Sequence, residues 1–159
     1  MRGGCCLRLV AHLVICVICG ACGRAASPAV ESGHEHKAPH GGTLVELGDE
    51  FAHVEVVLDA AAGTLTAYSL DGEAERAMRL PQPGMLVRFV LPGELPREVT
   101  LSGVSNALTG ETATDTSQFH ATIPALRGAT TFEGSIKNIV VRGTRFDDVA
   151  FRYPSNGHE

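Results

Sequence analysis

Three histidines stand within seven residues, in the letters HEHKAPH, and their spacing suits the binding of a metal ion. They are His34, His36 and His40. In an extended chain residues i and i+2 point the same way, so His34 and His36 can present two imidazoles together. Imidazole and carboxylate without thiolate favour Zn²⁺, Cu²⁺ or Ni²⁺ over Cu⁺. We therefore predict Zn²⁺ or Cu²⁺ as the bound metal, with a further ligand from the folded domain. His53 and Glu55 are the candidates for that ligand, and His53 is preferred.

The same histidines also have a plainer interpretation, in which they are solvated residues with incidental metal affinity. Imidazole titrates near neutral pH, which leaves pH sensing or contact with a partner as a further role. His53 alone is typical of a half-buried strand residue, and neither His120 nor His158 has a partner that the sequence reveals. Two hypotheses follow. The first is a protein that binds or buffers a divalent metal, and the second is a structural or protein-interaction protein with incidental histidines.

The first 21 residues have the pattern of a signal peptide. A short positive region precedes an apolar run over residues 9–19. That run is too short to cross a bilayer, because a spanning helix needs about 20 apolar residues. It leads into the letters CGAC, which resemble a bacterial lipobox with Cys19 where such boxes usually carry Leu. We predict that residues 1–21 are removed and that Cys22 is lipidated, which would anchor the protein to a membrane.

Each processing outcome that we consider places the domain outside the cytoplasm. The preferred one is a lipid-anchored protein on the periplasmic side of the cell envelope. The alternatives are plain secretion, with cleavage after Ala21 or near Ala25-Ala26, and a retained anchor. All five cysteines lie within the first 22 residues. The folded part is therefore expected to have neither a disulfide framework nor a cysteine-based metal site.

The remainder of the chain divides into a tether and one β-domain. Residues 22–42 contain prolines and lack apolar periodicity, which is typical of a disordered, flexible tether. Short aliphatic runs then alternate with turn residues, which predicts an all-β domain over residues 43–154 and a tail over residues 155–159. Strands at this spacing favour an antiparallel β-sandwich of the immunoglobulin-like kind or a small barrel.

The strands are expected between turns rich in Gly, Pro and Asp. Asp71-Gly72 is the best hairpin signal, because a type I′ turn needs positive φ at both central residues. In the run that starts at residue 51, the face with Val54 and Val56 is wholly apolar and should face the core. His53 and Glu55 belong to the other, mixed face. The expected strands are 43–47, 51–58, 64–70, 74–80, 85–91, 98–104, 118–123, 131–142 and 149–153.

The letters HEHKAPHGGTLVELGDEFAHVEVVLD resemble segments of two groups of bacterial envelope proteins. They are similar to small uncharacterised lipoproteins whose mature end carries an H-x-H…PHGG segment. More loosely, they resemble the N-terminal region of periplasmic adaptor subunits of heavy-metal efflux pumps. There an HGG motif opens a strand and an A-H-x-E-L-like strand follows.

In this chain the matching positions are His40-Gly41-Gly42, then His53 and Glu55. The likeness to the adaptors covers about residues 39–80. Their helical hairpin and lipoyl-like domain are not found in this sequence. The resemblance implies metal handling at the cell envelope, with an envelope protein or a metal-efflux component as a partner.

Charge and motifs argue against several other function classes. The 13 Lys and Arg against 18 Asp and Glu give a net charge of −5, too acidic for a typical nucleic-acid binder. The sequence contains no G-x-S-x-G, H-E-x-x-H, P-loop or dinucleotide fingerprint. Asp147 and Asp148 are neighbours, and an extended strand points neighbours to opposite faces. We therefore interpret them as a turn or edge feature and not as a general acid–base pair. We expect no enzymatic activity, no catalytic residue and no nucleic-acid partner.

Overall fold

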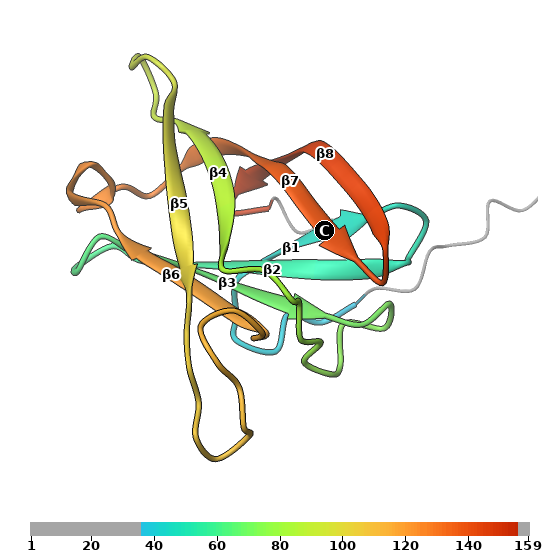
Figure 1. Ribbon diagram of the computed structural model, residues 1–159. Helices are drawn as coiled ribbons and strands as arrows, with labels where there is room; N and C mark the ends of the chain where they lie inside the picture. Colours follow the sequence, from blue (N-terminus) through green and yellow to red (C-terminus); the bar gives the residue numbers. More distant parts are fainter. Residues whose placement is uncertain (1–35, 156–159) are drawn as a thin grey trace, which may run out of the picture. The chain divides into compact units, whose positions relative to one another are not determined.

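The computed structural model describes residues 36–155, which form one antiparallel sheet of eight strands (Figure 1). The strand order is β1-β2-β3-β6-β5-β4-β7-β8. A short 3₁₀ helix, η1 (Pro124–Leu126), follows β6. The predicted signal peptide, the lipidation site Cys22 and the ligand candidate His34 lie outside the described residues. The strands are β1 (Thr43–Leu47), β2 (Ala52–Asp59), β3 (Thr64–Leu70), β4 (Gly84–Val90), β5 (Arg97–Gly103), β6 (Gln118–Thr122), β7 (Phe132–Val141) and β8 (Thr144–Tyr153).

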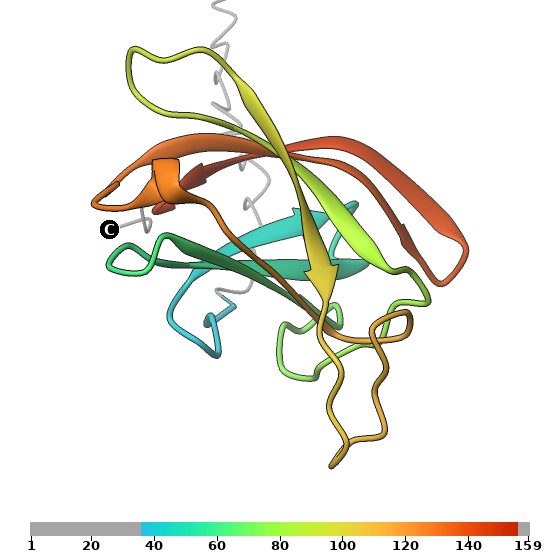
Figure 2. The ribbon, with the colours of Figure 1, turned by 60° about the vertical axis from the view of Figure 1, so that its left-hand side comes forward.

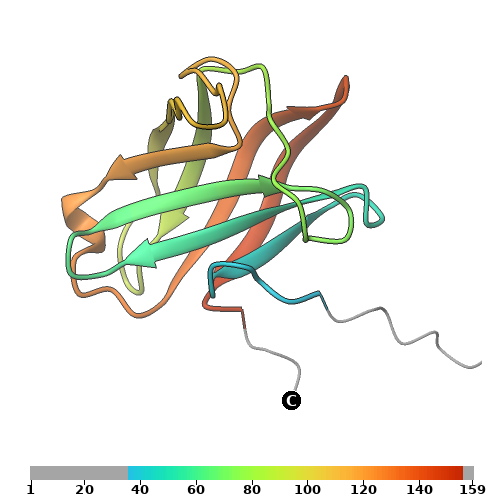
Figure 3. The same ribbon diagram turned by 90° about the horizontal axis from the view of Figure 1, so that it is seen from below.

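The sheet curls until its first and last strands approach each other. β1 and β8 are in contact, and the Ser155 backbone N–H donates a hydrogen bond of 2.9 Å to Thr43 Oγ1. Figure 2 shows β2 and β3 on one side of this curl and β7 and β8 on the other, and Figure 3 shows it from below. The all-β prediction is confirmed. Of the two expected arrangements the barrel describes the domain, because all eight strands belong to one nearly closed sheet.

In β1, β3 and β4 buried side chains alternate with less buried ones, as the two-residue period of a strand requires. In β2 the predicted core face is confirmed, since Val54 and Val56 are buried. In β3, Leu65 and Ala67 are likewise buried between less buried neighbours. The largest apolar side chains at the centre are Phe89, Phe119, Leu47, Leu65, Leu80, Met85, Leu101, Leu126, Ile136 and Ile139. This core fixes which side chains of β2 and β3 point outward, and the candidate site lies on that outer face.

The expected strand over residues 74–80 is wrong. In the described chain this region makes only isolated bridges, Leu70 with Ala77 and Leu80 with Thr116. The expected type I′ turn is also wrong, since a positive φ occurs at Ala74 and not at Asp71 or Gly72. The Asp71 carboxylate accepts hydrogen bonds from the backbone N–H groups of residues 75 and 76, at 3.0 and 3.2 Å. These bonds hold the chain in a wider loop.

The last strand begins earlier than expected, at Thr144 instead of residue 149. Arg142 and Gly143 both have positive φ, so the chain reverses directly after β7 and pairs along the full length of β8. Asp147 and Asp148 therefore lie within a strand at the edge of the sheet. No helix among residues 36–155 has the length and apolar character needed to cross a membrane.

Candidate functional site

Residues 36–42, which the sequence groups with the tether, lie against the outer face of β2 and β3. We call them the histidine segment. Figure 2 shows this segment, in blue, on the side of β2 and β3 that faces away from the rest of the barrel. Glu55 projects from that outer face and is fully buried. Its Oε1 accepts the backbone N–H groups of His40 and Gly42, both at 2.8 Å. A buried carboxylate on β2 therefore holds the segment against the sheet.

The letters PHGG explain why the chain can come so close to the sheet. Gly41 has a φ of +73°, and its N–H donates to the Ala38 carbonyl at 3.2 Å, so the chain turns at this point. Gly42 lies directly against β2, where a Cβ atom would clash with the Val56 carbonyl oxygen and the Val57 side chain. A glycine is required here for close approach, and this places the two N–H donors at Glu55.

His40 is held by two contacts at the end of the segment. Its Nδ1 lies 2.6 Å from Glu55 Oε2, and since a carboxylate accepts, this nitrogen donates. Its ring stacks on Tyr68 with a centroid distance of 3.8 Å and an interplanar angle of 9°. Burial and, second, the negative charge of Glu55 raise the pKa of Tyr68. His40 is thus oriented by β2 and β3 together, although 43% of its side chain stays exposed.

His36 and His53 form a pair at the beginning of the segment. Their ring centroids are 4.9 Å apart, and the rings are inclined by 58°. His53 is 4% exposed and lies beneath the segment, on the outer face of β2. Its Nδ1 is 3.3 Å from the Asp71 carbonyl oxygen, which can only accept. In the neutral ring this bond leaves Nε2 of His53 as the nitrogen with a free lone pair.

The Nε2 atom of His36 is buried and has no hydrogen-bond partner among the described residues. Glu50 Oε1 lies 3.5 Å from this nitrogen, but the two atoms do not form a hydrogen bond. Glu50 stands in the turn between β1 and β2 with a φ of 51°, and its N–H donates to Glu46 Oε1 at 2.9 Å. The pair therefore has one ring nitrogen, Nε2 of His36, without a hydrogen-bond partner among the described residues. A small shift would bring the Glu50 carboxylate within hydrogen-bond distance of it.

The two loops beside this pair are acidic. They meet at Gly72, where a Cβ atom would clash with the Glu50 carbonyl oxygen. Burial of the Asp71 carboxylate by itself raises its pKa. The backbone N–H bonds and the charges of Arg76 and Arg142 outweigh that effect, so the pKa of Asp71 is lowered overall. A negative surface of this kind raises the local concentration of cations. The acidic residues of the loops are Asp49, Glu50, Asp71, Glu73 and Glu75, and Glu46 of β1 lies next to them in the chain.

The predicted metal ligands are thus distributed over two places. His36 and His53 come together, while His40 is engaged with Glu55; His34 lies outside the described residues. Within residues 36–155, no group of three or more His, Cys, Asp or Glu residues is arranged to hold a metal ion. Sequence reasoning missed the contribution of Glu50, which carries no signal beyond its place in a Gly-Asp-Glu turn.

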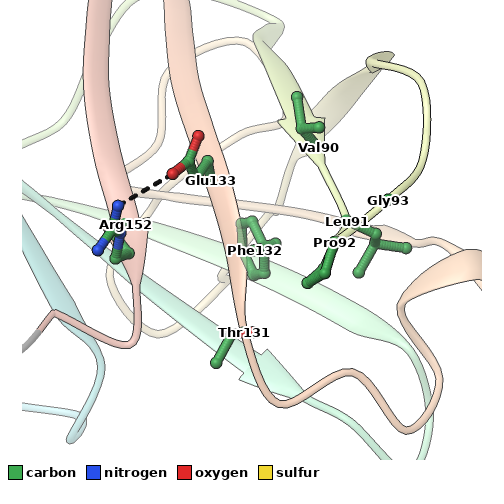
Figure 4. A pocket seen from close by; sticks show the side chains of 8 residues that line it. All are labelled: Val90, Leu91, Pro92, Gly93, Thr131, Phe132, Glu133 and Arg152. Carbon is green, nitrogen blue, oxygen red and sulfur yellow. Dashed lines mark hydrogen bonds and ion pairs between the residues drawn. The ribbon is translucent and has the colours of Figure 1, made fainter.

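A separate cleft of about 520 Å³ lies between the turn after β4 and the start of β7 (Figure 4). Phe132, which is buried, and Leu91 supply its apolar wall. At its rim, Arg152 and Glu133 form an ion pair of 3.0 Å. These two charges neutralise each other, and no predicted site residue lines the cleft.

Comparisons of the chain with protein-family models, with curated proteins and with solved structures gave no match. The resemblance to envelope lipoproteins and efflux adaptors therefore stays an expectation drawn from short motifs.

Proposed function

We propose that this protein is a cell-envelope lipoprotein whose β-domain binds or buffers a divalent transition metal through His36 and His53. The observation that carries the proposal is the buried Nε2 of His36, which lacks a hydrogen-bond partner in the described part of the chain, on a ring whose centroid is 4.9 Å from that of His53. A buried polar atom without a partner costs about 1–3 kcal/mol. A metal ion bound at that nitrogen would remove this cost.

The surroundings of His53 support the same proposal. A hydrogen bond from Nδ1 to a backbone carbonyl is the common way in which proteins orient a histidine that binds metal through Nε2. Glu50 supplies a carboxylate oxygen near the pair, and a set of imidazole and carboxylate ligands suits Zn²⁺ or Cu²⁺. We propose His34 as the ligand that completes the site, because it stands two residues before His36.

The proposed location rests on the N-terminal sequence. The positive region, the short apolar run and the letters before Cys22 support export and lipidation, with the domain on the periplasmic side of a membrane. The resemblance to efflux adaptors supports an envelope protein or a metal-efflux component as a partner. Under this proposal the domain would supply or withhold metal close to the membrane surface.

A second candidate function is that of a structural or protein-interaction lipoprotein in which the histidines are incidental. The observation that favours it is the exposure of two leucines on loops. Leu95 is 83% exposed and Leu108 is 98% exposed. Isolated exposed leucines are also ordinary on protein surfaces, so this candidate ranks second.

Calorimetric titration of Zn²⁺ and Cu²⁺ into soluble residues 23–159 separates the two functions. We expect micromolar or tighter binding, which falls at least tenfold in H36A and H53A. H120A is the matched control, because His120 is exposed on β6 and should leave binding unchanged. Equally weak binding in the wild type, H36A and H53A would contradict the metal function and favour the second candidate.

A further inference from the structure

Glu55 provides the hydrogen bonds that join the histidine segment to β2. It accepts two backbone N–H groups and the Nδ1–H of His40, and its side chain is fully buried. His36 stands four residues before His40 and makes no hydrogen bond with its Nε2 among the described residues. The position of His36 next to His53 therefore depends on the Glu55 carboxylate. That carboxylate makes no hydrogen bond with Nε2 of either histidine, the proposed metal-binding nitrogens.

We propose that Glu55 is the positioning residue of the His36–His53 pair, and that metal binding is coupled to docking of the histidine segment. This inference rests on the proposed metal function. His53 belongs to the sheet and His36 to the segment, so one ion can bind both only while the segment is docked. By linkage, an ion bound to both histidines holds the segment on the sheet.

The coupling has a measurable size. An ion that binds only the docked form lowers the undocked population by the factor 1 + [L]/Kd, which is about 100 at a free metal concentration of 100 Kd. Conversely, the apparent affinity falls in proportion to the docked fraction. If loss of the Glu55 charge lowers that fraction to about a tenth, the apparent affinity falls about tenfold.

In a lipid-anchored protein this coupling would also set the reach of the domain. A fully extended chain spans at most about 3.3–3.6 Å per residue, so release of the seven residues 36–42 would lengthen the tether by at most about 25 Å. Metal loading would then draw the domain closer to the membrane, and metal loss would let it extend.

Limited proteolysis tests the docking directly. Lys37 is exposed within the segment, and trypsin cleaves the Lys37–Ala38 bond. Proteases cut such a segment through its undocked form. Cleavage of this one bond in the 23–159 protein is followed by mass spectrometry with and without Zn²⁺. We expect Zn²⁺ at 100 Kd to slow cleavage about 100-fold in the wild type. E55Q should be cleaved at least tenfold faster without metal and bind Zn²⁺ about tenfold more weakly.

Controls separate positioning from general stability. E98Q is the matched substitution, because Glu98 is exposed on β5, and it should behave as the wild type in both measurements. H36A with the same Zn²⁺ reports any effect of the metal on trypsin. Circular dichroism checks that E55Q is folded. If E55Q does not fold, H40A keeps the carboxylate and its two backbone donors and should show a smaller increase in cleavage.

The possible failures are distinguishable. If E55Q and H40A are cleaved at the wild-type rate, Glu55 does not hold the segment, and the inference is overturned whether or not Zn²⁺ binds. If E55Q is cleaved faster but Zn²⁺ binds neither the wild type nor E55Q, the proposed metal function is refuted, and so is the coupling that rests on it. If Zn²⁺ binds through His36 but leaves cleavage unchanged, the metal function stands and the coupling is refuted.

Discussion

The hydrogen bond between His40 Nδ1 and Glu55 Oε2 should be measurable as an interaction energy between the two side chains. A buried hydrogen bond to a charged group contributes about 1.5–3 kcal/mol. The carboxylate is fully buried, but 43% of the His40 side chain is exposed, so solvent screening lowers the expected value to about 1 kcal/mol. H40A also loses the ring stack on Tyr68, which contributes about 0.5–1.5 kcal/mol.

A double-mutant cycle isolates that energy. Urea unfolding of the wild type, E55Q, H40A and the double variant is followed by circular dichroism at pH 7. We expect each single variant to lose about 2 kcal/mol, and the double variant to lose about 1 kcal/mol less than their sum. The pair E98Q and H40A is the control and should be additive. Additivity within about 0.3 kcal/mol for Glu55 and His40 would refute the side-chain hydrogen bond, and docking would then depend on the two backbone N–H groups that Glu55 accepts.

Two further predictions follow from shifted pKa values. Hydrogen bonds, chiefly from Ser117, lower the pKa of Glu111 below its ordinary 4.5. The ionised group therefore adds stability that is present above pH 4.5 and is lost as the pH falls through the folded-state pKa. In urea unfolding E111Q should be less stable than the wild type at pH 7, by a difference that shrinks in acid; a difference independent of pH contradicts this. Burial and the Glu55 charge raise the pKa of Tyr68. In a Tyr153→Phe background, where Tyr68 is the only tyrosine, phenolate absorbance should titrate above pH 10, and E55Q should lower that midpoint; an unchanged midpoint would show that the two groups do not interact.

Much of the β-structure follows from local pattern. The bounds of β1 and β3 match the predicted runs 43–47 and 64–70. The buried face of β2 was predicted from the alternation of apolar residues, because strand geometry alone points alternate side chains the same way. These features depend on neighbours within a few residues, which the sequence displays directly.

Features that depend on distant partners were not predictable in this way. The run 74–80 has the composition of a strand, yet the chain there makes only isolated bridges. The Asp71 carboxylate binds two backbone N–H groups and so replaces the tight turn that Asp-Gly suggested. Whether a side chain will compete with strand pairing for backbone donors is decided by the surrounding fold.

The candidate site shows the same difference between features set by local pattern and features set by distant contacts. Residue types and spacing identified His36, His40, His53 and Glu55 as candidate metal ligands. The two-residue period of the strand placed His53 and Glu55 on the same face of β2. The sequence predicts that this face mixes polar and apolar residues, and that residues 22–42 form a flexible tether. The folded chain instead lays residues 36–42 over β2, buries Glu55 and His53, and separates His40 from the His36–His53 pair. Periodicity is a local property, whereas burial of a carboxylate against backbone donors 13 and 15 residues away exists only once the sheet and the segment have come together.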